Sequence, residues 1–374
     1  MQVQPLKMVE VIEKLKEKVT LLPLGDPSFR DPRYEVEKLD IKNFHPISKN
    51  AKDVTLCFID GGSLKVATAP NFAVKLHRLY FNLYRNNQRQ KPKNLPQRIH
   101  FYTICYAVSE SKGIFYQVEF VPIKDEWLRF LPNPSDLRFY SFDRTLMSGL
   151  RRASASRAAE AVRAFTEWVF ASHVIEQELS SNDIITRDGA LQTFVTDESN
   201  YANMAYQSAM NKGVIFTGLA KTTTIFTTTG YPLLAAIKEL AETSPFSNTS
   251  WYYHPIAKVN HPEHRAEMFA VRFDPRSDYV FRFEILRDQA EKMTQTEMEA
   301  VIATLASNTG DASFYGYPYG LVDADRFARG SDEEKDGQEI QFEVAASQRA
   351  LWKKLSGFIR TTDAHSRLNK ILGE

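Results

Sequence analysis

Carboxylates stand at two places in the sequence where buried strands are expected to end. Asp60 closes the apolar run that starts at Val54, and Asp188 closes a shorter run that starts at Asp183. Acids at the carboxyl ends of neighbouring strands can converge at one edge of an α/β sheet, where ligands bind. Such oxygen clusters bind Mg²⁺ or Mn²⁺, and two ions about 4 Å apart can activate water for phosphodiester cleavage.

A helical glutamate is expected to join these aspartates. The long helix predicted between them carries Glu160 and Glu167, one heptad apart on the same face, and, nearer its end, Glu176 and Glu178. The stretch from Glu167 to Asp188 holds the rest of the helix, a loop and one strand, so both side chains can return to the same end. Each acid also has an ordinary interpretation, because Asp before Gly is common in turns and a Glu on a helix surface is usually solvated.

The elements that must position these acids can be predicted from hydrophobic periodicity. An amphipathic helix is expected at 7–20. The core then begins with strands expected at 54–60, 64–69, 99–108 and 114–123. It continues with a helix within 145–180, a strand at 183–188, a helix at 198–211 and a strand at 213–221. This order favours an α/β fold with a mixed β-sheet flanked by helices.

The sequence pattern after residue 230 predicts further helices and one hairpin. We expect helices at 232–243, 294–306 and 340–360, strands at 268–274 and 279–286, and a solvated loop at 329–339. The basic, Tyr- and Phe-rich segment 76–94 is interpreted as a surface helix, with a path for a nucleic-acid strand as the alternative. The histidines His254, His261 and His264 lack a neighbouring Cys, which disfavours a zinc site.

Four tracts in this order resemble the NurA family of nucleases: FIDGG (58–62), ITRDGAL (185–191), GVIFTGLAKTT (213–223) and YGYPYGLVDADRFAR (315–329). The resemblance implies an RNase H-like fold over roughly 54–350. It implies Asp60, Glu167, Asp188 and Asp325 as metal ligands, with Glu160 and Asp323 as the alternatives to Glu167 and Asp325. It also implies that Lys221 holds the scissile phosphate or offsets charge in the transition state.

The tracts depart from the family pattern at three positions. Gly320 replaces a proline, Ala220 replaces a serine, and Asp325 replaces a histidine. An aspartate can take the place of imidazole as a ligand for Mg²⁺ or Mn²⁺. These departures motivate an alternative function, that of a catalytically degenerate RNase H-like subunit that binds DNA within an ATPase complex.

The resemblance implies a function for the whole chain. It is expected to be a deoxyribonuclease that uses Mn²⁺ or Mg²⁺, with two ions, to process DNA ends as a homodimer with a hexameric HerA-type ATPase. No Gly-x-x-x-x-Gly-Lys-Ser/Thr motif occurs, so the chain should lack a motor of its own. Residues 1–53 are expected to form a helical and extended segment for dimer or partner contacts, and 54–374 the nuclease domain. Cleavage polarity, strand preference, the identity of the ATPase, and a role in repair or in defence stay open.

Composition sets limits on the class of protein. The net charge of +1 is not that of a strongly basic nucleic-acid binder, so DNA binding would need a local basic groove. Cys57 and Cys105 lie in apolar runs, which favours buried thiols over a disulfide-stapled secreted fold. No leader-like N-terminus and no membrane-spanning run is found, so a cytoplasmic protein without membrane contact is expected.

Overall fold

The computed structural model describes residues 4–19, 22–48 and 50–361. Contacts between Cα atoms divide the chain into two units. Unit 1 comprises Met1–Lys52, Gly189–Leu191 and Gly218–Tyr317, and unit 2 comprises Asp53–Asp188, Gln192–Thr217 and Pro318–Glu374. One change of unit, at Lys52/Asp53, lies beside the boundary expected at 53/54, but residues 218–317 join the N-terminal residues in unit 1.

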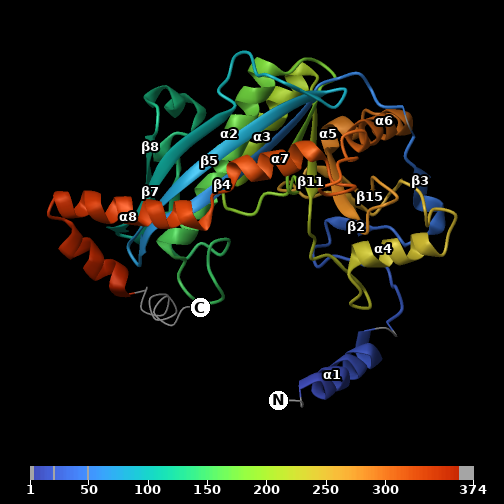
Figure 1. Cartoon of the computed structure of the whole chain (residues 1–374), viewed down its shortest axis with the longest axis horizontal. Coiled ribbons are helices and arrows are strands. Elements are labelled where there is room, and N and C mark those ends of the chain that lie inside the picture. Colours follow the sequence, from blue (N-terminus) through green and yellow to red (C-terminus); the bar gives the residue numbers. More distant parts are fainter. Residues whose placement is uncertain (1–3, 20–21, 49, 362–374) are drawn as a thin grey trace. The chain divides into compact units, whose positions relative to one another are not determined.

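Unit 2 contains the mixed β-sheet expected from the sequence (Figure 1). Its strands are β4 (Leu56–Ala69), β5 (Phe72–Arg85), β6 (Gln88–Gln90), β7 (Arg98–Glu110), β8 (Gly113–Pro122), β9 (Arg138–Tyr140), β10 (Ile184–Asp188) and the first half of β11 (Ile215–Ala220). They follow the order β11-β10-β4-β5-β7-β8-β9, and β6 pairs with β5. Strands β4 to β8 are antiparallel, whereas β10 runs parallel to β4 after a helical crossover. This is the RNase H-like arrangement, so the predicted fold class is confirmed.

Helices cover both faces of this sheet. They are α2 (Ala155–Glu178), α3 (Glu198–Lys212), α7 (Tyr319–Ala328) and α8 (Asp332–Gln348), and another helical stretch follows at 352–361. A Cβ added to Gly61 would meet Glu167 of α2, whereas one added to its neighbour Gly62 would meet Ala328 of α7. Because successive residues of a strand face opposite sides, α2 and α7 lie on opposite faces of β4.

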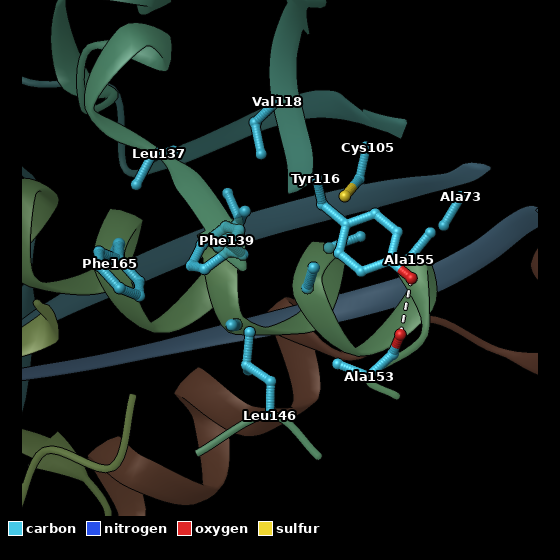
Figure 2. Close-up of a cluster of buried hydrophobic side chains, with 14 residues drawn as sticks. Ala73, Cys105, Tyr116, Val118, Leu137, Phe139, Leu146, Ala153, Ala155 and Phe165 are labelled. Atoms are coloured by element: carbon cyan, nitrogen blue, oxygen red, sulfur yellow. Dashed lines mark hydrogen bonds between the residues drawn. The ribbon is translucent and has the colours of Figure 1, made fainter. Parts of the chain in front are cut away.

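The core under α2 is built from small and aromatic side chains (Figure 2). Buried alanines of α2, among them Ala155 and Ala158, let the helix lie close to β7 and β8, while Phe139 and Phe165 fill the space beside them. The buried Tyr116 donates a hydrogen bond of 2.6 Å from its hydroxyl to the carbonyl of Ala153, which fixes the entry into α2. A buried hydroxyl left without a partner would cost stability.

Three sequence interpretations within unit 2 are wrong. Gly61-Gly62 forms no turn, because β4 runs through both glycines and joins the strand expected at 64–69 to the first one. Residues 76–85 form strand β5 rather than a surface helix; nearly every side chain there is buried, so no period-2 pattern marks the strand. The loop expected at 329–339 instead starts α8 at Asp332, capped by the hydroxyl of Ser331.

Within unit 1, four antiparallel strands of the sheet follow the order β3 (Phe44–Pro46), β13 (Trp251–Tyr253), β15 (Ala266–Arg272), β16 (Phe281–Leu286). Its helices are α1 (Gln4–Val19), α4 (Leu233–Glu242), α5 (Arg287–Ala290) and α6 (Gln295–Ala306). Two short pairs join β1 (Pro27–Ser28) to β12 (Phe226–Thr227) and β2 (Tyr34–Val36) to β14 (Ala257–Val259). The predicted hairpin and the helices expected at 7–20, 232–243 and 294–306 are confirmed. In the described ranges no helix is long and apolar enough to cross a membrane.

Candidate metal centre

Asp60 and Asp188 are brought together by the parallel pairing of β4 and β10. The register places Arg187 beside Ile59, so the next residues of the two strands, Asp188 and Asp60, lie side by side. Asp188 is the last residue of β10, as expected, because Gly189 then leaves the strand with φ +109°. Asp60 is not at a strand end but at the fifth position of β4, which corrects the expected location without separating the two carboxylates.

Helix α7 supplies the third aspartate, Asp325. The helix can approach β4 this closely because glycines occupy two contact points. A Cβ on Gly320 would lie 2.0 Å from the ring of Phe58, and one on Gly62 would lie 2.1 Å from the carbonyl oxygen of Ala328. Gly320, which replaces the proline of the family pattern, therefore has a packing reason of its own. Helix α7 consequently lies on the face of β4 from which Asp60 projects.

Asp60, Asp188 and Asp325 each offer one carboxylate oxygen, and these oxygens lie within 4.8 Å of one another. Three partly buried, hard oxygen donors at this spacing suit a Mg²⁺ or Mn²⁺ ion. Burial and the nearby carboxylates of Asp188 and Glu167 raise the pKa of Asp60 well above its usual range. Concentrated negative charge of this kind is what a bound cation relieves.

Asp323, the alternative to Asp325, has a different environment. It is buried, and its carboxylate accepts hydrogen bonds from Asn82 at 3.1 Å and Tyr84 at 3.4 Å and pairs with Arg89 at 3.0 Å. Residues two positions apart in a helix lie about 200° apart around its axis. Asp323 and Asp325 therefore point to opposite sides of α7. The structure brings Asp325 to the other carboxylates and uses Asp323 to hold α7 against β5.

Glu167 lies on the α2 face of β4, opposite the face from which Asp60 projects, and is not one of the group of three aspartates. It is buried, and its carboxylate accepts hydrogen bonds from Arg163 and, at 2.9 Å, from Arg187. Its approach to β4 depends on Gly61, where a Cβ would lie 2.5 Å from Oε1 of Glu167. A ligand role for Glu167 stays a prediction. Sequence reasoning did not anticipate that Arg187, the residue before Asp188, would pair with it.

Glu160, the alternative to Glu167, lies one heptad earlier in α2. Its carboxylate pairs with Lys75 of β5 and with Arg163 at 3.2 Å, and it accepts a hydrogen bond of 3.2 Å from Ser63. Burial disfavours its ionised form, but Lys75 and Arg163 outweigh that effect and lower its pKa to about 2. Glu160 is therefore engaged as the anion of an ion-pair network.

Lys221 belongs to unit 1, whereas the three aspartates belong to unit 2. Within unit 1 its ammonium lies 5.5 Å from the ring centroid of Tyr317, a cation–π distance. Its predicted role at the scissile phosphate stays a prediction. Two histidines of unit 1 contact carboxylates: His264 contacts Glu284 at 2.9 Å and His254 contacts Glu267 at 2.6 Å.

A pocket of about 340 Å³ opens beside the aspartates, between β4 and the start of α8; we call it the β4–α8 pocket. Its lining residues are Asp60, Gly61, Gly62, Ser63, Leu64, Lys65, Asp325, Arg329, Gly330, Asp332 and Lys335. The sequence analysis missed its three cations, Lys65, Arg329 and Lys335. The only signal was that Arg329 ends the tract at 315–329, directly after the helix that carries Asp325.

Comparisons with known proteins give one structural likeness to report. No family model matches the sequence, and no curated protein does. Among solved structures, the chain is similar to one described as the crystal structure of NurA, with a TM-score of 0.42 and 8% sequence identity. The superposition covers 88% of this chain and 94% of that chain.

Proposed function

We propose that this chain is a metal-dependent nuclease that hydrolyses phosphodiester bonds in DNA. The observation that carries the proposal is the meeting of Asp60, Asp188 and Asp325, from two parallel strands and a helix across them, with carboxylate oxygens within 4.8 Å. These residues come from three distant parts of the sequence. Burying like charges together is costly, and a divalent cation held between them would offset that cost.

In this proposal the residues at the site have three roles: binding the ion, attracting the substrate phosphates and positioning neighbouring side chains. Asp60, Asp188 and Asp325 would hold Mn²⁺ or Mg²⁺, which supplies Lewis-acid stabilisation of the phosphate and a more acidic bound water. Arg329, Lys335 and Lys65 of the adjoining pocket would attract the substrate phosphates. Glu167 would hold Arg163 and Arg187 in place behind β4. A second ion, as the resemblance implies, would need ligands beyond the three aspartates, and Glu167 is the additional carboxylate that the resemblance implies.

The assembly that we propose follows from the resemblance alone. It is a homodimer that acts on DNA ends together with a HerA-type hexameric ATPase. Helix α1 supports a role in contacts, because Met8, Ile12 and Leu15 of this amphipathic helix are each more than half exposed. Isolated helices of this length are marginal in water, so α1 would gain stability from a partner surface.

Digestion of end-labelled linear DNA with Mn²⁺ tests the proposal. Asp60→Asn, Asp188→Asn and Asp325→Asn should each reduce cleavage at least a hundredfold, since each removes one charged ligand, a loss of about 3 kcal/mol in transition-state stabilisation. Asp125→Asn is the matched control, because Asp125 is an exposed aspartate outside both the pocket and the group of three. It should keep nearly full activity.

A second readout separates ion binding from catalysis. A bound ion stabilises the folded chain by mass action, so Mn²⁺ should raise the melting temperature of the wild type and of Asp125→Asn but not of the three ligand variants. Mn²⁺-dependent stabilisation without cleavage, even with a HerA-type ATPase present, would contradict the nuclease and leave an ion-binding subunit. Absence of both effects in a folded wild type would favour the degenerate DNA-binding subunit.

A further inference from the structure

The β4–α8 pocket has a built wall opposite the aspartates. Gly330 presses against β4 so closely that a Cβ there would lie 2.3 Å from Leu64. Helix α8 is then fixed along β4 and its neighbours by an ion pair between Arg78 and Glu334 and by a hydrogen bond of 2.7 Å from Tyr102 to Gln338. The start of α8, which carries Lys335, is therefore held at a set distance from the strand that carries Asp60.

The net charge in and beside this pocket depends on the ion. The lining contains three carboxylates, from Asp60, Asp325 and Asp332, and three cations, from Lys65, Arg329 and Lys335. Asp188 adds a fourth carboxylate beside the lining, and Glu339 pairs with Lys65 at 3.1 Å. Five carboxylates thus face three cations when no ion is present, and a divalent ion on the aspartates would offset this negative excess. An anion is therefore attracted to the pocket once the ion has bound, and hardly before.

The chemical character of the lining selects the kind of anion. No residue of the lining is aromatic and none is an Asn or Gln, so it offers no base-stacking platform and no amide for reading a base edge. Lys and Arg side chains and a Ser hydroxyl are groups that contact phosphates. Lys65 lies five residue steps along β4 from Asp60, about 16 Å at about 3.3 Å per step. Since one nucleotide of a stacked strand rises roughly 3.4 Å, this stretch of β4 is longer than one nucleotide.

We infer that the β4–α8 pocket binds the sugar–phosphate backbone of the substrate strand on one side of the scissile bond, without reading its bases, and only after the divalent ion is in place. The inference rests on the proposed function, since it names the substrate chemistry of that site. Arg329 and Lys335 contact phosphates that flank the one to be cut. Cleavage is consequently independent of sequence at these positions, and the ion binds before the DNA.

Equilibrium binding tests this without cleavage. The probe is a short fluorescent oligothymidylate, measured by anisotropy with Ca²⁺ as an oxygen-seeking ion and again with a chelator. Binding should require the ion. The double variant Arg329→Gln/Lys335→Gln should bind about tenfold more weakly, and its salt dependence should fall by about 0.7 in log–log slope for each lost phosphate contact. Lys353→Gln, on an exposed lysine outside the pocket, is the control and should match the wild type.

Further arms separate the possible outcomes. An abasic oligonucleotide of equal length should bind within about threefold of the normal one if the contacts are to phosphates. Tighter binding to one base composition, wild-type affinity in the double variant, or equal binding with and without the ion would each overturn the inference. Because binding is measured without cutting, ion-dependent binding that the double variant loses supports the pocket even if the wild type cuts no DNA. Cleavage by the wild type with unchanged binding by the double variant would overturn the pocket alone.

Discussion

Gly62→Ala is the most informative single change in the chain. An added Cβ would lie 2.1 Å from the carbonyl oxygen of Ala328, where ordinary contact begins at 3.4 Å. The shortfall is the difference, 1.3 Å, and the opposing atom belongs to the backbone, so no side-chain rotation can relieve it. The last turn of α7 must therefore move by about 1 Å. Overpacking of this kind costs about 1–3 kcal/mol of stability.

The functional effect should exceed the effect on stability. Asp325 lies one helical turn before Ala328, so its carboxylate moves with that turn, whereas metal–ligand distances tolerate only about 0.2 Å. Gly62→Ala should therefore lose most of the Mn²⁺-dependent rise in melting temperature, which for the wild type at a hundred times its dissociation constant corresponds to about 2.7 kcal/mol. Melting is followed by circular dichroism with and without Mn²⁺.

A glycine with free space around it supplies the control. A Cβ on Gly337 of α8 meets no atom within 4 Å, so Gly337→Ala should keep the Mn²⁺ response and gain about 0.5–1 kcal/mol from helix propensity. A folded Gly62→Ala protein with the wild-type dissociation constant for Mn²⁺ would refute the reasoning, because it would show that α7 does not need this contact to place Asp325.

Two further predictions concern buried charge. Burial and the carboxylates of Asp188 and Glu167 raise the pKa of Asp60 above its ordinary value of 3.8. Protonated Asp60 therefore stabilises the metal-free fold at pH values below 3.8, and this stabilisation is lost as the pH rises through the raised pKa. Asp60→Asn should thus flatten the fall in urea midpoint with rising pH in the presence of EDTA; parallel curves for variant and wild type would contradict this. In unit 1, burial disfavours the Glu284 carboxylate, but Arg282 and His264 outweigh it and lower its pKa to about 2. Glu284→Gln should lower the free energy of unfolding by about 3–5 kcal/mol at neutral pH, measured with urea, because it leaves the buried Arg282 and His264 without their anion. The difference from the wild type should shrink as the pH falls from 4.5 toward 2. A loss below about 1 kcal/mol at neutral pH would contradict this.

The sequence by itself determined the kind of fold and most of the acids. Apolar runs with strand composition, one long alanine-rich helix and the order of these elements were enough for a mixed sheet flanked by helices. They were also enough to pair Asp60 with Asp188, because a strand after a helical crossover runs parallel to its neighbour. The acidic tract after Pro318 was identified only through the family resemblance, which implied Asp325 as the ligand and left Asp323 as the alternative.

Tertiary structure decided what depends on close approach between distant segments. Gly61-Gly62 looks like a turn in sequence, yet it is the place where α2 and α7 reach β4 from opposite faces, and only the packing shows that no Cβ fits there. Strand β5 is covered on both sides, so its sequence lost the alternation that identifies a strand. The choice of Asp325, the pairing of Glu167 with two arginines, and the cations of the β4–α8 pocket all follow from side-chain direction in space. A one-dimensional pattern records the spacing of residues along one element, but not which faces of two elements meet.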